Sequence, residues 1–162
     1  AMTMPPDPPE WLLAGHPQRE SGIARGRELY FGLGACVSCH GNTALGDGQQ
    51  NDYDDWTKDW MKELGIGPED QQRIDEFVAL GAMPPRNLVP RNLRLGGFRG
   101  GRRPMDLYWR LKNGIEGTPM PAAAADMSSD DLWCLVEYVR QMPLEPISRS
   151  EHSATLNERP PR

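Results

Sequence analysis

The chain has 162 residues, a mass of 18.2 kDa and a net charge of −5, with 38% hydrophobic residues, 17 glycines and 16 prolines. This length suits one domain with a real core, and the many glycines and prolines indicate long loops. No apolar run approaches the roughly eighteen residues of a membrane span. No segment shows the alternation typical of strands, so an all-α fold is expected.

The first predicted segment is an extended, proline-rich arm or linker over residues 1–20. Pro5-Pro6 and Pro8-Pro9 exclude a helix there. Trp11, Leu12 and Leu13 are expected to pack this arm against the rest of the molecule. The opening Ala1-Met2 suggests that a signal peptide, membrane anchor or fused domain has been removed.

A first helix is predicted from Ser21 to Gly34, because the apolar residues between them keep helical spacing and glycine commonly ends helices. Gly26 lies inside this helix, where glycine costs roughly 1 kcal/mol relative to alanine. We expect another helix to pack closely against Gly26, which would compensate for this cost.

The sequence Cys36-Val37-Ser38-Cys39-His40 follows directly. Two cysteines three apart and an adjacent histidine are the spacing of a c-type haem attachment site. One turn of backbone presents both thiols to the two vinyl groups of a haem, and the next side chain reaches the iron. The motif predicts one haem c, covalently bound through Cys36 and Cys39, with His40 as an iron ligand.

Two other interpretations of this motif remain open. A structural zinc site needs four ligands, and only Cys134, His16 and His152 are left to complete it. A redox dithiol is expected within a βαβ unit, whereas a helix and a glycine-rich loop flank this motif. Cys134 itself is interpreted as a small buried hydrophobe.

The charges are unevenly distributed. Ten acidic residues lie between Asp47 and Glu76 against three basic ones, and seven arginines lie between Arg86 and Arg110 against a single aspartate. Such a dipolar molecule can orient a charged partner. Nucleic acid is not an expected partner, because no recognised binding module accompanies the arginines.

The acidic stretch predicts two short helices over residues 54–81. The first is capped by Asp54 or Asp55, and Pro68 opens the second. Their apolar residues lie at helical spacing: Trp56, Trp60 and Leu64 in the first, and Ile74, Phe77 and Val78 in the second. We expect both helices to pack as satellites on the main domain.

Two further helices are predicted near the C-terminus. One runs from Pro104 to Gly114 and the other from Ser128 to the residue before Pro143, with a loop over 115–127 between them. Residues 143–162 form a polar, proline-bearing tail.

A second iron ligand is sought among eight methionines. Met120 is flanked by Pro119 and Pro121, which stiffen its loop and hold the sulfur in one direction. Met83, before two prolines, is the rival ligand. Iron held on both sides by protein is closed to substrate and transfers single electrons, and a methionine ligand raises its reduction potential.

The chain resembles the class I monohaem c-type cytochromes over roughly residues 22–142. The resemblance rests on the first helix, the haem motif, the loop Gly117-Thr118-Pro119-Met120-Pro121 and the closing helix from Asp131 to Val139. It implies a cytochrome c domain over residues 21–142, with three to five helices around one haem and long irregular loops. It also implies that the first and last helices cross, with Gly26 and Tyr30 against Leu135 and Tyr138. The acidic segment 54–81 departs from the pattern.

The segment from Asn92 to Pro104 is similar to a segment of bacterial members of this family. Guanidinium groups pair bidentately with carboxylates such as the haem propionates. Arg99, Arg102 and Arg103 are therefore the candidate propionate contacts.

The expected function is electron transfer between respiratory or other redox partner proteins. The chain would act as a monomeric free carrier or as a domain of a larger oxidoreductase. It would work in the periplasm or on the outer face of the cytoplasmic membrane, where haem c is attached in this family. The alternative is a haem enzyme or gas sensor whose sixth iron ligand is displaced.

Overall fold

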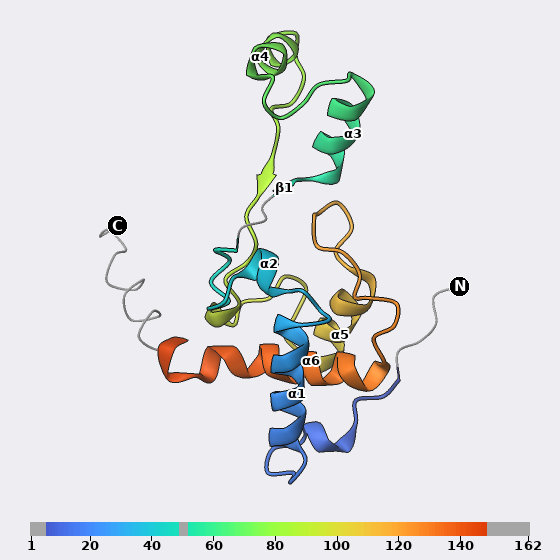
Figure 1. The fold of residues 1–162 in the computed structure, drawn as a ribbon, viewed down its shortest axis with the longest axis vertical. Coiled ribbons are helices and arrows are strands. Elements are labelled where there is room, and N and C mark those ends of the chain that lie inside the picture. The colour runs from blue at the N-terminus through green and yellow to red at the C-terminus, as the bar shows by residue number, and fades with distance from the viewer. Residues whose placement is uncertain (1–5, 49–51, 149–162) are drawn as a thin grey trace.

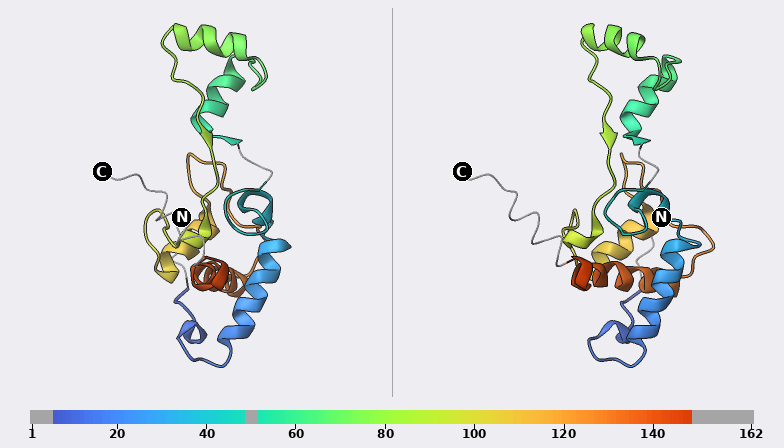
Figure 2. Two further views of the ribbon diagram at one scale, coloured as in Figure 1. Left: turned by 90° about the vertical axis from the view of Figure 1, so that its left-hand side faces the viewer. Right: turned by 60° about the vertical axis from the view of Figure 1, so that its left-hand side comes forward.

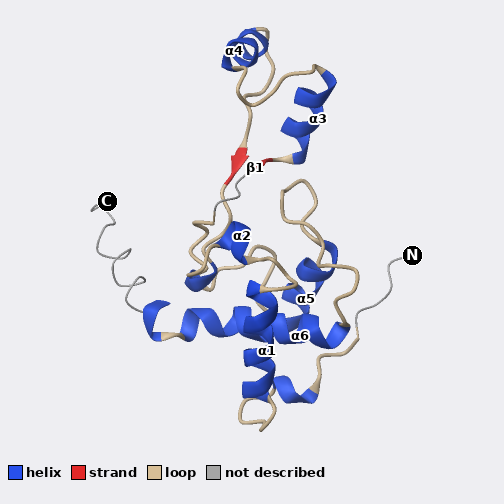
Figure 3. Cartoon of the chain, in the orientation of Figure 1, coloured by secondary structure: helices blue, strands red, loops and turns tan. Residues whose placement is uncertain are grey.

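The computed structural model describes residues 6–48 and 52–148 and is mostly helical (Figures 1 and 3). None of its helices is both long enough and apolar enough to cross a membrane. The elements in chain order are η1 (Glu10–Leu12), α1 (Arg19–Phe31), α2 (Val37–His40), β1 (Asp52–Tyr53), α3 (Asp55–Glu63), α4 (Gln71–Ala79), β2 (Asn87–Leu88), η2 (Leu93–Leu95), α5 (Pro104–Asn113), α6 (Ser129–Gln141) and η3 (Met142–Leu144).

Helices α1 and α6 cross at the centre of a body that also contains α2, α5, η2 and η3 (Figure 1). Gly26 makes the close crossing possible: a Cβ on it would lie 2.1 Å from the carbonyl oxygen of Cys134 and 2.8 Å from the Cβ of Tyr138. The Tyr30 and Tyr138 rings meet edge to face at 5.7 Å. The predicted close crossing is confirmed.

Helix α6 supplies more of the core of the body than any other element. Its N-cap is Ser128, as predicted, whose hydroxyl accepts a hydrogen bond from the Asp131 amide at 3.0 Å. The buried side chains that pack around it come mainly from α1, α5 and α6, and they include Leu29, Tyr30, Leu107, Tyr108, Leu132, Trp133, Leu135, Val136 and Met142. The fully buried Glu137 carboxylate is held between Arg19 and Arg140.

A second, smaller unit stands apart from the body (Figures 1 and 2). We call residues 52–88 the lobe: β1 and β2 pair antiparallel at its base, with Asp52 opposite Leu88, and α3 and α4 form its head. Its own buried cluster consists of Met61, Ile66 and Ile74. The expectation that these helices pack on the main domain is wrong, because the buried apolar residues of α3 and α4 pack against each other within the lobe.

Other local predictions also change. Pro68 lies in a turn, and α4 begins at Gln71, because the Asp70 carboxylate caps it by accepting from the Arg73 amide. The described part of the chain holds six α-helices rather than three to five, since the haem motif forms a short helix of its own. It also holds the two short strands, which the lack of alternating residues did not predict.

The N-terminal arm is not fully extended. It contains the turn of 3₁₀-helix η1, and α1 already begins at Arg19. Trp11 packs closely on Gly22, where a Cβ would lie 2.5 Å from its ring, so this residue fixes the arm as predicted. Leu13 does not, because it is 65% exposed. Most of the predicted tail, residues 149–162 with His152, lies outside the described residues.

Candidate functional site

The haem motif forms one closed turn of helix. The His40 and Cys39 amides donate to the Cys36 carbonyl at 2.9 and 3.3 Å, and the Ser38 hydroxyl donates to the Ala35 carbonyl at 2.7 Å. Side chains at positions i, i+3 and i+4 share one face of a helix. The turn therefore presents Cys36, Cys39 and His40 to the same side.

The chain enters and leaves this turn through strained or glycine positions. Ala35, just before it, has a φ of 46° in the left-handed region, which a residue with a Cβ rarely adopts. Gly41, just after it, has a φ of 81°, and its buried carbonyl accepts a 2.8 Å hydrogen bond from the Tyr30 hydroxyl. A Cβ on Gly48 would lie 2.4 Å from the Cys39 carbonyl oxygen, so the following loop closes tightly on the motif.

The ring of His40 is held in one orientation. Its Nδ1 lies 3.0 Å from the carbonyl oxygen of Arg91. A carbonyl oxygen only accepts, so Nδ1 carries the proton and the lone pair of the neutral ring is on Nε2. Burial lowers the pKa of His40, and this favours the neutral, metal-binding form. Metal-bound histidines are commonly oriented by such a hydrogen bond from the second nitrogen.

All three cysteines are thiols rather than disulfides. Burial raises the pKa of Cys36 and of Cys134 to about 11. Cys134 packs against the core, as predicted for a small apolar residue, but it is half-buried rather than buried. Within residues 6–48 and 52–148, no group of three or more His, Cys, Asp or Glu side chains is placed to hold a metal ion.

The Met120 loop is held by its own backbone. The Ile115 amide donates to the Met120 carbonyl at 3.1 Å, and the Met120 amide donates to the Thr118 hydroxyl at 3.3 Å. Gly114 allows the return of the chain, because a Cβ on it would lie 2.7 Å from the Met120 carbonyl oxygen. The loop between α5 and α6 rises on the same side of α6 as α2 (Figures 1 and 2).

The rival iron ligands lie elsewhere. Met83 is part of the lobe and 56% exposed. His16 lies in the arm before α1, where its Nδ1 accepts a hydrogen bond from the Gln18 amide at 3.2 Å.

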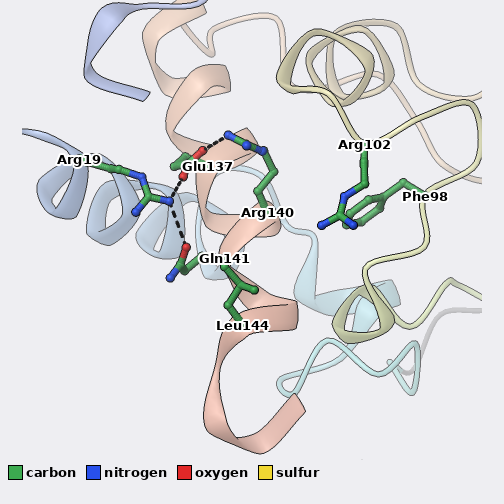
Figure 4. A pocket seen from close by; sticks show the side chains of 7 residues that line it. All are labelled: Arg19, Phe98, Arg102, Glu137, Arg140, Gln141 and Leu144. Carbon is green, nitrogen blue, oxygen red and sulfur yellow. Dashed lines mark hydrogen bonds and ion pairs between the residues drawn. The ribbon is translucent and has the colours of Figure 1, made fainter. Parts of the chain in front are cut away.

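The three candidate propionate arginines are exposed and do not share one environment. Arg103 pairs with Asp106 at 2.8 Å at the start of α5, which lowers the pKa of that carboxyl. Arg102 lines a small pocket of about 110 Å³ on the body, with Phe98 and with Arg19 and Arg140 around Glu137 (Figure 4). No ion pair engages Arg99 among the residues that the structure describes.

Sequence reasoning missed two other arginines, one that contacts the motif and one that contacts the loop after it. Arg91 orients His40 through its backbone carbonyl, a group that every residue carries. Arg94 is buried, and its guanidinium donates to the Thr43 carbonyl, to Glu145 at 2.7 Å and to Ser148 at 3.0 Å. Its position between two leucines was the available signal of burial.

No protein-family model matches the chain, and no curated protein is significantly similar to it. A solved structure is similar: the reducing HAO-like protein complex Kustc0457/Kustc0458 of Kuenenia stuttgartiensis. The match has a TM-score of 0.54 and 26% sequence identity. It covers 86% of this chain and 47% of that chain, so this chain spans about half the length of its neighbour.

Proposed function

We propose that this protein is an electron-transfer protein that carries one haem c, attached through Cys36 and Cys39 and ligated by His40 and Met120. The fold would then be that of a class I cytochrome c, with the lobe as an addition. The single observation that carries this proposal is the turn of α2, which aims two thiols and an oriented imidazole to one side.

The residues of the site fit this cofactor. The carbonyl of Arg91 holds the proton of His40 on Nδ1 and leaves Nε2 as the donor atom. The hydrogen-bonded loop around Met120 fixes the backbone of the second ligand, so that its sulfur can serve without a conformational search. When bound, the haem iron supplies a one-electron couple.

Protein ligands on both sides of the iron would close it to substrates and leave outer-sphere electron transfer. A methionine ligand and a buried haem both favour the reduced form, so a relatively high reduction potential is expected. The chain is similar to about half of a chain in a complex whose name describes it as reducing and HAO-like. This similarity supports a role beside larger redox partners. We place the protein in the periplasm or on the outer face of the cytoplasmic membrane.

The test is production of the full chain in a host that attaches haem c. The purified protein should carry one haem by intact mass and by its pyridine haemochrome spectrum, and a Cys36→Ser/Cys39→Ser variant should carry none. The ferric protein should show the weak near-infrared band of methionine-ligated haem.

Met120→Ala should abolish that band and make the reduced protein bind carbon monoxide, because the sixth iron position is opened. Met83→Ala is the matched control and should retain the band. If instead Met83→Ala loses the band, Met83 is the ligand. If the unaltered protein binds carbon monoxide tightly, the iron serves a haem enzyme or a gas sensor.

A further inference from the structure

The lobe carries the net charge of the whole molecule. Residues 52–88 hold nine acidic and four basic side chains, a net charge of −5. The rest of the chain holds fourteen of each sign and is therefore neutral overall, against a total of −5. This charge stands away from the body (Figure 1), so it faces solvent rather than apposed protein.

Helix α3 presents an acidic row beside an apolar row. Asp55, Asp59 and Glu63 are spaced by four residues and are all exposed. The next row contains Trp56, which is 44% exposed, and it ends at Leu64, which is 38% exposed. We call these five residues the α3 face.

Helix stability accounts for Asp55, which lies in the first turn of α3, but neither it nor the body accounts for Asp59 and Glu63. Lys58 lies near Asp55 at 3.8 Å, but Asp59 and Glu63 have no ion-pair partner in the described part of the chain. Like charges four residues apart destabilise a helix. The extensive contacts that hold the body together are made by α1, α5, α6, η2 and η3, and not by α3.

We propose that the α3 face is a docking surface for a partner protein that presents lysines and arginines around an apolar centre. Basic side chains would pair with Asp59 and Glu63, which are available, and the partner's apolar side chains would cover Trp56 and Leu64. Charge complementarity of this kind steers association and fixes orientation. An aromatic anchor bordered by charges matches the apolar centre and polar rim of protein interfaces.

The test uses a basic probe protein and its charge-reversed form. The probe is mitochondrial cytochrome c, which is rich in surface lysines, and the control is the same protein after succinylation, which converts those ammonium groups into carboxylates. Binding to the full chain is measured by isothermal titration calorimetry at low and high salt. The heat of binding can be measured whether or not this chain carries haem. The result can therefore be interpreted even if the proposed function is wrong.

Two variants with the same net charge separate the α3 face from general electrostatics. Asp59→Lys/Glu63→Lys reverses the charge of the face, and Glu63→Lys places a cation at the C-terminal end of α3, where it suits the helix dipole. Glu10→Lys/Asp126→Lys reverses two exposed acidic residues of the body. The first should weaken binding of the native probe by about tenfold or more, and the second by less than about twofold.

Further measurements complete the test. Trp56→Ser should weaken binding at high salt as well as at low salt, because it removes apolar contact rather than charge. The succinylated probe should not bind. Equal loss in both charge variants, or no binding of the native probe at low salt, would overturn the proposal. Sedimentation of the chain alone supplies the last outcome: self-association that the α3 variant abolishes would assign the face to a second copy and also overturn it.

Discussion

The residues around the haem motif differ in how visible they are in the sequence. Cys36, Cys39 and His40 stand out in the sequence, because attachment to one haem would constrain their spacing within five consecutive positions. The support from Arg91 could not be predicted, because it comes from a backbone carbonyl 51 residues away. The buried ion pair of Arg94 could not be predicted for a similar reason, because its carboxylate partner, Glu145, is also 51 residues away in the sequence.

Tyr30 provides a test of how firmly the motif is supported. Its buried hydroxyl donates to the buried Gly41 carbonyl, the residue after His40, and burial raises the pKa of this phenol, so it remains a donor at neutral pH. Tyr30→Phe removes this hydrogen bond and leaves the Gly41 carbonyl with the 3.2 Å bond from the Ala44 amide alone. We expect the free energy of unfolding, measured by urea denaturation, to fall by about 0.5–1.5 kcal/mol.

Tyr108→Phe is the control for this prediction. Tyr108 is equally buried, but its hydroxyl bonds the exposed Ser129 at 3.2 Å, where water can replace it. A loss below about 0.5 kcal/mol is expected there. Equal losses in the two variants would show that the hydrogen bond to Gly41 contributes no more to stability than the hydrogen bond to Ser129.

At the scale of elements, the sequence located helices well and their partners less well. α3, α5 and α6 begin where capping or proline signals predicted, because these signals act within one turn. The position of α3 and α4 could not be read, since an apolar stripe shows that a face is covered but not by which element. Gly26 was informative because a costly residue inside a helix implied a close neighbour.

The α1–α6 crossing yields a prediction at Gly26. A methyl group there would meet the Cys134 carbonyl at 2.1 Å, and backbone cannot move aside as a flexible side chain can. Gly26→Ala should therefore destabilise the protein by about 3 kcal/mol or more, despite the better helix propensity of alanine. The change is measured as a shift in the denaturation midpoint.

Gly97→Ala is the matched substitution, because nothing lies within 4 Å of its Cβ position. Its stability should stay within about 0.5 kcal/mol of the unaltered protein. If the Gly26→Ala protein is as stable as the Gly97→Ala protein, α1 and α6 can move apart without a loss of stability.

The whole molecule combines a large core with a small one, and the two should differ in stability. The core of the body gathers fourteen buried residues, whereas the cluster of the lobe has Met61, Ile66 and Ile74 alone. A small core leaves little margin over the entropy of ordering the chain. The lobe should therefore open more readily than the body, as a local unit of unfolding.

Ile74→Ala tests this independence. Ile74 is 3% exposed, and truncation of such a residue costs about 2–5 kcal/mol, comparable to what a cluster of three residues can supply. Hydrogen exchange should accelerate at the amides of α3 and α4 and remain unchanged in α1 and α6. Leu132→Ala, at a 1% exposed position of α6, should accelerate exchange in the helices of the body instead. If Ile74→Ala loosens α1 and α6 as much as α3 and α4, the lobe and the body unfold as one cooperative unit, and binding at the lobe would be coupled to the stability of the turn at residues 36–40.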